Sequence, residues 1–296
     1  MAPDKFAATW VSHSSICDFQ HCPRAYYLKN IYKDPKTNRK LQIISPPLAL
    51  GQVVHTVLES LSKLPADKRF QESLLDIFEK EWISVSGKKG GFFDEETEHH
   101  YKERGKEMLR RVIQHPGPLA NMAVKIKEEL PWFWLSETDS IILCGKIDWL
   151  EYIEQNNSVH IIDFKTGKNV EDSNSLQLPI YYLLVHYCQK RTVSKISYWH
   201  LQLHDEPQEQ PLPDLQGSYD EVQKIAKKIK LARQLEHFSC KEDGCRYCLP
   251  YESILKGEAE FVGKGSYGHD IYVVQMSGAG NKFDDFVEED EESVIL

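Results

Sequence analysis

Two runs of apolar and β-branched residues, at 140–152 and 158–164, constrain the fold of this chain most strongly. The polar sequence EQNNS separates them, which predicts two strands paired as a hairpin. A similar run at 123–130 predicts a third strand of the same sheet. Apolar residues at helical spacing precede and follow these strands. The sequence therefore predicts an α/β protein in which these strands form one sheet and helices lie before and after it in the chain.

The segments around the strands are predicted as follows. Residues 10–33 form two short helices, with Ser12 or Ser14 as the N-cap of the first and Pro23 at the start of the second. Residues 35–48 are polar and contain proline, which favours a loop. One further run of apolar and β-branched residues predicts a strand at 194–203. Apolar residues at helical spacing predict helices at 49–64, 70–84, 96–114, 174–189 and 219–236.

The expected organisation is one domain over residues 1–275. It would contain a helical block at 50–125, a sheet core at 126–205, and a helix with a cysteine knuckle at 219–250. Residues 276–296 carry one Lys against seven Asp and Glu, and we expect a disordered acidic tail there. Alternatively, this tail imitates a nucleic acid and occupies the protein's own cleft.

The charge and hydropathy patterns limit the classes of partner. A net charge of −9 argues against a surface that binds nucleic acid over its whole extent. Residues 1–50, however, carry seven Lys and Arg against three Asp and Glu, so a local basic patch remains possible. No apolar run approaches the ~20 residues of a membrane span, and no secretory signal is visible. We expect a soluble cytoplasmic protein with no membrane partner.

The segment 144–168 contains the residues most suited to catalysis. Asp148 is expected at the end of one strand, and Asp163 and Lys165 at the end of the next. Because side chains alternate along a strand, Asp163 and Lys165 should lie on the same face. Two converging carboxylates would hold a hard divalent cation, and the lysine would orient a water or stabilise charge on a phosphate. This is a minimal set for metal-dependent phosphodiester hydrolysis. The alternative is an ordinary Asp–Lys pair at the surface.

Residues on the neighbouring helices extend this site. Gln177 and Tyr181 lie four apart on one helix, so both could hydrogen-bond a phosphate or water, or simply form a half-buried face. His55 lies in an apolar helical stretch, either as a core residue or as a further metal ligand, which would suit Mn²⁺ better than Mg²⁺. Glu128 or Glu129 could add another carboxylate.

The seven cysteines include a cluster that suggests metal ligation. Cys240, Cys245 and Cys248 form C-x4-C-x2-C, and a fourth ligand would complete a site for an iron–sulfur cluster or for zinc; free thiols are the remaining alternative. An odd number of cysteines without an export signal argues against a disulfide framework. Cys144 and Cys188 lie in apolar stretches and are expected in the core.

Five motifs in a fixed order resemble a known superfamily. They are S-x-S…C-P-R-x-Y-Y from Ser12, G-x3-H ending at His55, G-x-I-D ending at Asp148, D-F-K-T-G from Asp163, and Q-x3-Y from Gln177. Together they resemble the PD-(D/E)XK nucleases over about residues 10–250. More narrowly they are similar to the RecB-like branch, which includes CRISPR-associated exonucleases and the nuclease domains of bacterial recombination helicases.

The resemblance implies a fold and a set of roles. The fold would be an α/β restriction-endonuclease-like core, a mixed central sheet flanked by helices, here with a helical insertion. Asp148, Asp163 and His55 would bind Mg²⁺ or Mn²⁺, Lys165 would assist the attacking water, and Gln177 and Tyr181 would support the lysine and the DNA phosphate. Such proteins are typically exonucleases that act on DNA ends.

The resemblance also implies a fourth ligand for the cysteine cluster. Related nucleases close a 4Fe–4S cluster between one N-terminal cysteine and three C-terminal ones, which makes Cys22 the candidate and Cys17 a possible substitute. The spacing departs from the family's usual one, in which a C-x2-C pair precedes the third cysteine. Zinc therefore stays open as an alternative.

The expected function is a Mg²⁺- or Mn²⁺-dependent DNA exonuclease, favouring single-stranded ends, in DNA repair, recombination or CRISPR adaptation. Basic residues of 24–40 and 224–233, Arg24, Lys227 and Lys228 among them, would contact the DNA backbone, and Tyr26 and Tyr27 would stack on bases. Helicase, recombination or CRISPR adaptation proteins are possible partners, and the chain has no P-loop of its own. Alternatives are a catalytically silent or partner-dependent DNA-binding subunit and a restriction-type endonuclease.

Overall fold

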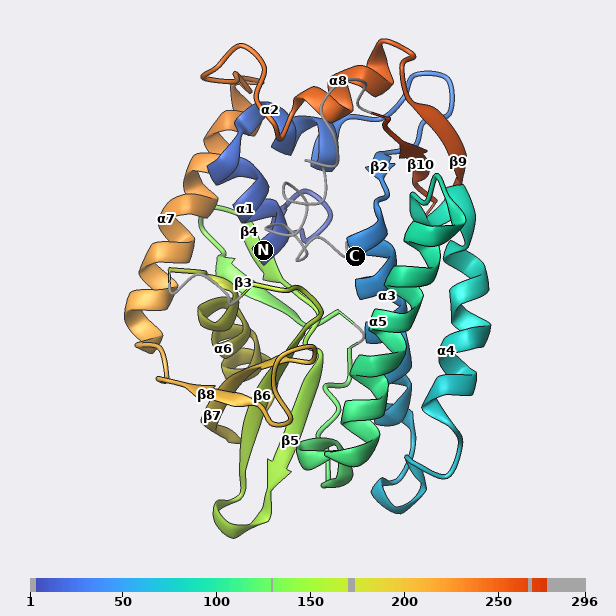
Figure 1. The fold of residues 1–296 in the computed structure, drawn as a ribbon. Helices are drawn as coiled ribbons and strands as arrows, with labels where there is room; N and C mark the ends of the chain where they lie inside the picture. Colours follow the sequence, from blue (N-terminus) through green and yellow to red (C-terminus); the bar gives the residue numbers. More distant parts are fainter. Residues whose placement is uncertain (1–3, 129, 170–173, 266–267, 276–296) are drawn as a thin grey trace.

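The computed structural model describes residues 4–128, 130–169, 174–265 and 268–275. The acidic tail predicted at 276–296 and the candidate ligand Glu129 lie outside the described residues. The described chain is mixed α/β, as predicted, with its strands arranged in three sheets (Figure 1).

The largest sheet has four strands in the order β5-β6-β7-β8. A second sheet has the order β1-β4-β3 and a third the order β2-β10-β9. The strands are β1 (Thr9–Val11), β2 (Leu41–Ile43), β3 (Trp132–Ser136), β4 (Ile141–Cys144), β5 (Trp149–Ile153), β6 (Ser158–Lys165), β7 (Thr192–His200), β8 (Gln208–Gln210), β9 (Glu260–Lys264) and β10 (Asp270–Val273).

Helices cover the four-stranded sheet from two sides. Helices α3, α4 and α5 lie on one side of the molecule, α6 and α7 lie on the other, and α1, α2 and α8 lie together at one end (Figure 1). The helices are α1 (His13–His21), α2 (Pro23–Tyr26), α3 (Pro46–Ser60), α4 (Leu74–Trp82), α5 (Glu95–Gln114), α6 (Gln177–Cys188), α7 (Leu215–Gln234) and α8 (Leu249–Leu255). Among the described residues, no helix is long and apolar enough to cross a membrane.

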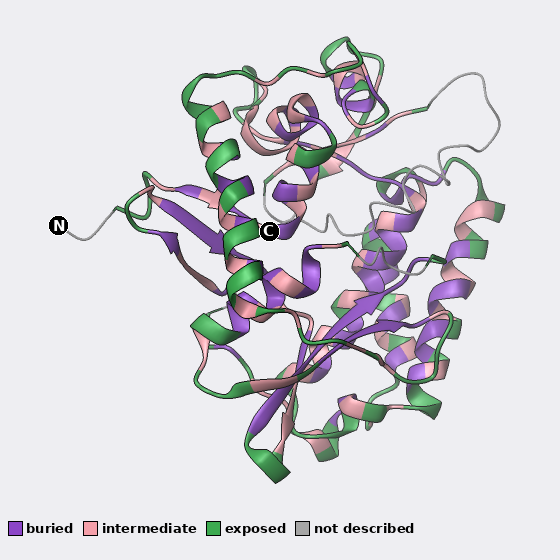
Figure 2. Cartoon of the chain, turned by 90° about the vertical axis from the view of Figure 1, so that its left-hand side faces the viewer, coloured by how far each residue is buried: buried purple, intermediate pink, exposed green. Residues whose placement is uncertain are grey.

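The hairpin predicted from EQNNS is confirmed. Strand β5 pairs antiparallel with β6, with Trp149 opposite Ile162, and Asn157 takes the left-handed conformation in the turn, at φ 51°. Strand β6 then pairs in parallel with β7. All residues of β6 are buried, since each face of the sheet packs on helices (Figure 2). Parallel pairing needs a crossover between the strands, and α6 supplies it.

The two faces of the sheet pack in two separate cores. Ile162 and Phe164 lie in the core formed with α3, α4 and α5. Val159 and Ile161, on the opposite face of the same strand, lie in the core formed with α6 and α7. This alternation decides which helices the polar residues farther along β6 will meet.

Three strand predictions are wrong. Among the described residues of 123–130, the β-pairing is limited to one isolated bridge from Ala123 to Glu151, and the strand is instead β3. The run at 140–152 is divided by residues 145–148, so β4 and β5 belong to different sheets. The prediction that all of these strands belong to one sheet is therefore also wrong. Gly145 lies at the break: a β-carbon there would come within 2.8 Å of the end of the Leu184 side chain on α6, so a larger residue would require that side chain to shift.

The loop predicted at 35–48 contains a strand as well. Residues 41–43 form β2, which pairs in parallel with β10, more than two hundred residues away along the chain. The helices predicted at 49–64, 70–84, 96–114, 174–189 and 219–236 are each present, with shifted ends. Ser12 caps α1 in a reciprocal capping box with Ser15, and Pro23 begins α2, both as predicted.

Candidate active site

A cavity of about 610 Å³ opens where β5 begins and β6 ends. Its walls come from α3, the start of α6 and the N-terminal segment around α1. All six residues predicted for catalysis or metal binding line it; they are His55, Asp148, Asp163, Lys165, Gln177 and Tyr181. Such a convergence of titratable groups in one concave site is typical of an active site.

Strand β6 delivers Asp163 and Lys165 to the cavity. They continue the face of Val159 and Ile161, so they point toward the α6 side of the sheet. Both are buried, with 2% and 8% of their surfaces exposed, and Lys165 Nζ lies 3.3 Å from Asp163 Oδ2. The lysine is also held 5.4 Å from the centre of the Tyr198 ring. Asp163 and Lys165 thus lie on one face of the strand, as the sequence predicted, and form a buried ion pair.

Asp148 immediately precedes β5 and is held from two directions. The backbone N–H of Phe164 donates a hydrogen bond to Asp148 Oδ2 over 2.9 Å. The other carboxylate oxygen lies 3.3 Å from His55 Nδ1. Because the hairpin places Trp149 opposite Ile162, Asp148 stands beside Asp163, as the sequence predicted.

His55 faces the cavity from α3, whose other residues anchor the helix in the core. Val53, Val54 and Val57 are fully buried in that core. Burial by itself would lower the pKa of His55, but the nearby Asp148 carboxylate outweighs it and raises the pKa to about 9. Burial would likewise raise the pKa of Asp148, yet His55 and the Phe164 N–H hold it below its usual value. The pair is therefore charged in the absence of metal.

Glu59 is a site residue that the sequence analysis missed. It lies one turn after His55 on α3, and ligand atoms of His55, Glu59 and Asp148 all lie within 4.8 Å of one another. Its carboxylate also pairs with Lys146 Nζ at 2.5 Å. The four-residue spacing from His55, which puts both side chains on one helix face, is the signal that would have found it.

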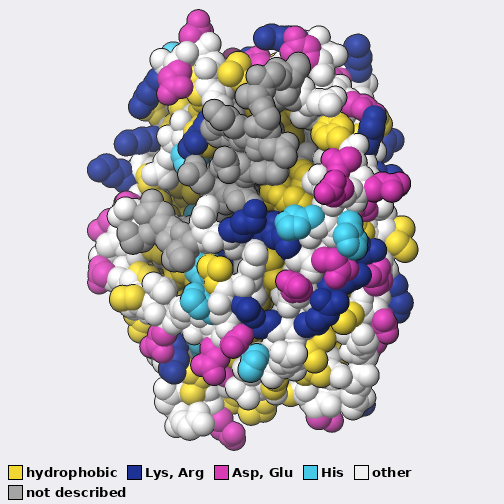
Figure 3. Space-filling model, in the orientation of Figure 1, with side chains coloured by type: hydrophobic (Ala, Val, Ile, Leu, Met, Phe, Trp, Pro, Cys, Tyr) yellow, Lys and Arg dark blue, Asp and Glu magenta, His cyan; other side chains and the backbone are white. Residues whose placement is uncertain are grey.

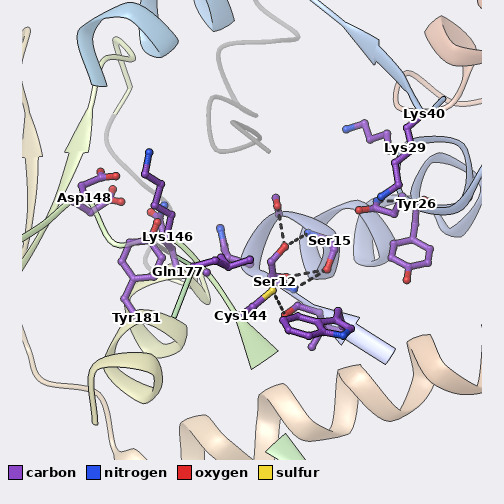
Figure 4. Close-up of a pocket in the computed structure, with 18 of the residues that line it drawn as sticks. Ser12, Ser15, Tyr26, Lys29, Lys40, Cys144, Lys146, Asp148, Gln177 and Tyr181 are labelled. Atoms are coloured by element: carbon purple, nitrogen blue, oxygen red, sulfur yellow. Dashed lines mark hydrogen bonds between the residues drawn. The ribbon is translucent and has the colours of Figure 1, made fainter. Parts of the chain in front are cut away.

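Gln177 and Tyr181 reach the cavity from the first turns of α6. Gln177 is only 5% exposed, and its Oε1 atom has no hydrogen-bond partner among the described residues. Figure 4 shows both side chains on the same side of the cavity as Asp148 and Lys146. A buried amide with an unused acceptor is ready to bind a group that enters the cavity.

The residues predicted to bind DNA are placed differently. Arg24 is paired with Glu252 at 2.6 Å, and Lys227 with Asp139 at 3.2 Å. The Tyr26 ring is packed inside the protein and is 1% exposed, whereas Tyr27 is half-buried and its ring stacks on Phe238. Of these residues only Tyr26 lines the cavity. Tyr26 therefore has no exposed ring face for a base.

Two further predicted residues lie away from the cavity. Lys228 is exposed on α7 and is not among the residues that line it. Glu128 is also outside the cavity lining, and its charge instead raises the pKa of Cys188, although burial is the larger cause of that shift.

Cys22, Cys240, Cys245 and Cys248 come together at the end of the molecule formed by α2 and α8. Their sulfur atoms all lie within 4.8 Å of one another, so Cys22 is the fourth member, rather than Cys17. The N–H of Cys245 donates to Cys248 Sγ, and backbone N–H groups of Glu242 and Gly244 lower the pKa of Cys240 to about 7. This arrangement favours a thiolate at Cys240, whereas burial raises the pKa of Cys22 and raises that of Cys248 to about 11.

The remaining cysteines lie outside this group. Cys144 is buried, and burial raises its pKa to about 12. Cys188 packs at the edge of the core formed with α6 and α7. Both placements agree with the prediction that these are core residues.

Comparison with known proteins identifies the family. The sequence model of the PD-(D/E)XK nuclease superfamily matches residues 10–254, which include every residue of the cavity and cysteine group named above. A comparison with curated proteins found no match. The matched range covers most of the chain and the fold is the mixed α/β arrangement expected of such nucleases. The chain belongs to the PD-(D/E)XK nuclease superfamily.

Proposed function

We propose that this protein is a metal-dependent DNA exonuclease of the RecB-like type, which hydrolyses phosphodiester bonds at single-stranded ends. The observation that carries the proposal is the convergence of Asp148, Asp163, Lys165 and His55 in one cavity. The resemblance to recombination and CRISPR-associated exonucleases points to DNA repair, recombination or CRISPR adaptation as its setting.

The ligand set fits Mg²⁺ or Mn²⁺. His55, Glu59 and Asp148 supply an imidazole nitrogen and carboxylate oxygens within 4.8 Å of one another, and Asp163 lines the same cavity. Oxygen ligands suit both ions, and the imidazole favours Mn²⁺. The bound ion would polarise the phosphate and lower the pKa of a water.

The other side chains act on the water and the phosphate. Lys165, fixed by Asp163, would orient the attacking water and offset the charge that grows on the phosphate oxygens. Gln177 lines the same cavity, and its buried Oε1 atom, which has no partner among the described residues, would accept a hydrogen bond from the water. Because the surrounding protein already holds these buried side chains in place, they need to move little when the substrate enters.

The size of the cavity favours a single strand. A volume of about 610 Å³ lies within the range of pockets that hold one small ligand. A nucleotide at the end of one strand fits such a space, whereas a duplex would have to remain outside. A free end is thus the substrate best suited to reach the buried carboxylates.

For the four cysteines we propose an iron–sulfur cluster, which would join α2 to the segment before α8. Zinc is the alternative, and one observation favours it: the sulfurs lie within 4.8 Å of one another, and Cys245 Sγ and Cys248 Sγ are 3.7 Å apart. Thiolates around one ion, with Zn–S bonds of about 2.3 Å, are closer together than thiolates around a four-iron cube. Iron and zinc analysis with a visible spectrum decides between them.

The nuclease proposal is tested with Mn²⁺ and end-labelled linear single-stranded DNA beside a circular single strand. The wild type, Lys165→Met, and the control Lys195→Met on the neighbouring strand β7 are compared. We expect degradation of the linear strand alone, lost only in Lys165→Met. Cleavage of the circle would indicate an endonuclease. No cleavage by folded, metal-loaded wild type would favour a silent or partner-dependent DNA-binding subunit.

A further inference from the structure

We propose that Lys33, Lys40 and Arg233 form a phosphate-binding subsite at the far end of the active-site cavity. The subsite would hold the backbone of the DNA strand whose end lies at Asp148 and Asp163. This inference deepens the proposed function and rests on it for the identity of the strand. It assigns the backbone contacts to residues other than Arg24, Lys227 and Lys228.

The cavity connects the two ends. Its lining includes Asp148 and Asp163 as well as Lys33, Lys40 and Arg233. In Figure 4, Asp148 and Gln177 lie on one side, Ser12 and Ser15 between, and Lys29 and Lys40 on the opposite side. Arg233 comes from the last turn of α7, and Lys33 and Lys40 come from the segment between α2 and β2. A strand entering the cavity would pass these cations before reaching the carboxylates.

The three cations differ from the other basic groups nearby. Lys29 pairs with Asp18 at 2.6 Å, Lys146 with Glu59, and Arg39 with Asp270 at 3.2 Å. Within the described part of the chain, Lys33, Lys40 and Arg233 have no carboxylate within 4.0 Å. Their charge is therefore available to a ligand, whereas that of their neighbours is already balanced.

Their mutual repulsion indicates what the ligand is. Burial lowers the pKa of Lys40, and the charges of Arg233 and Lys33 lower it further. Lys40 is half-buried, whereas Lys33 and Arg233 are exposed. Like charges held close together cost free energy, and an anion between them removes that cost. The phosphodiester backbone supplies such an anion at every nucleotide.

The arrangement recognises phosphate rather than base. Arg233 Nη1 donates to the Tyr26 hydroxyl over 3.4 Å, which orients the guanidinium, and the Tyr26 ring is buried. Contacts of this kind position a strand without reading its sequence. Elsewhere, on the face shown in Figure 3, acidic and basic side chains are intermixed rather than gathered into a basic surface. The cavity is therefore where we place the backbone contacts.

The test measures binding of a fluorescein-labelled 20-nucleotide oligothymidylate by anisotropy. All proteins carry Lys165→Met and no divalent metal is added, so binding is measured without cleavage. One variant carries Lys33→Gln, Lys40→Gln and Arg233→Gln. The control variant carries Lys63→Gln, Lys68→Gln and Lys190→Gln, three exposed lysines that do not line the cavity and have no carboxylate within ion-pair distance among the described residues. Both variants lose the same charge.

We expect the subsite variant to bind on the order of 50-fold more weakly at 0.15 M salt, with the slope of log K against log salt reduced by about 2, because each single-strand phosphate contact contributes about 0.7. The affinity of the control variant should change less than about threefold.

Equal losses of affinity in the two variants, or no loss in either, would overturn the subsite. Lys40→Arg should retain binding, and melting temperatures establish that each variant is folded. If the wild type fails to cleave but the expected binding difference is found, the nuclease proposal fails and the subsite stands.

Discussion

Replacing Lys165 with methionine should both destabilise the metal-free protein and abolish cleavage. Methionine keeps the length of the side chain and its packing near Tyr198 but removes the charge. Asp163, 2% exposed, would then remain as a buried carboxylate without its lysine 3.3 Å away. Removing one partner of a buried ion pair costs about 3–5 kcal/mol, since the other charge stays desolvated.

The same substitution on the neighbouring strand is the control. Lys195 pairs with Glu209 at 3.6 Å, but the two side chains are 49% and 61% exposed. An exposed pair contributes about 0–1 kcal/mol, so Lys195→Met should leave stability nearly unchanged. Both variants replace one lysine of an ion pair on a strand, but only Lys165→Met leaves a buried carboxylate without its partner.

The measurement is thermal unfolding in EDTA and again with Mn²⁺. A loss of 3 kcal/mol should lower the Tm by about 6–12 °C in a domain of this size. Mn²⁺ should recover part of the loss, because the proposed site would place the cation beside Asp163, and binding to the folded state stabilises it. Cleavage should fall by about 10²–10⁴-fold. Equal melting temperatures for Lys165→Met and Lys195→Met in EDTA would refute the reasoning about the buried pair, and retained cleavage would refute the role of the lysine.

Three further predictions concern metals. Glu59→Gln should weaken Mn²⁺ binding by about tenfold or more in a titration. The control Glu72→Gln, which removes an exposed partner of Lys80, should leave the affinity unchanged. Equal Mn²⁺ affinities of the two variants would remove Glu59 from the ligand set. His55 has a pKa of about 9 without metal and must lose its proton to bind one, so Mn²⁺ affinity should rise about tenfold per pH unit from pH 6.5 to 8.5; a flat profile would contradict ligation by His55. Anaerobically purified protein should be brown, with absorbance near ~400 nm, and Cys22→Ser should lose that colour while Cys17→Ser keeps it. Colourless wild type with bound zinc would replace the cluster with zinc, and no metal at all would leave the thiols free.

Much of the catalytic site followed from local patterns. The alternation along β6 placed Asp163 and Lys165 on one face, and the polar turn predicted the hairpin that brings Asp148 beside them. The spacing of Gln177 and Tyr181 placed both on one face of α6. These inferences hold because the side-chain periods of strands and helices depend only on the local backbone.

Local sequence patterns were therefore enough to predict the hairpin, the helices and the face on which each candidate residue lies. Long-range contacts were needed to show that the described strands form three sheets, that Cys22 joins the C-terminal cysteines, that Glu59 meets Asp148, and which cations have no carboxylate partner among the described residues. Arg24 and Lys33 look alike in the sequence, yet Arg24 meets Glu252, 228 residues away, and Lys33 does not meet a carboxylate in the described chain. Periodicity reports that a residue is buried or exposed, but the partner of a strand, a thiol or a charge depends on contacts between distant segments.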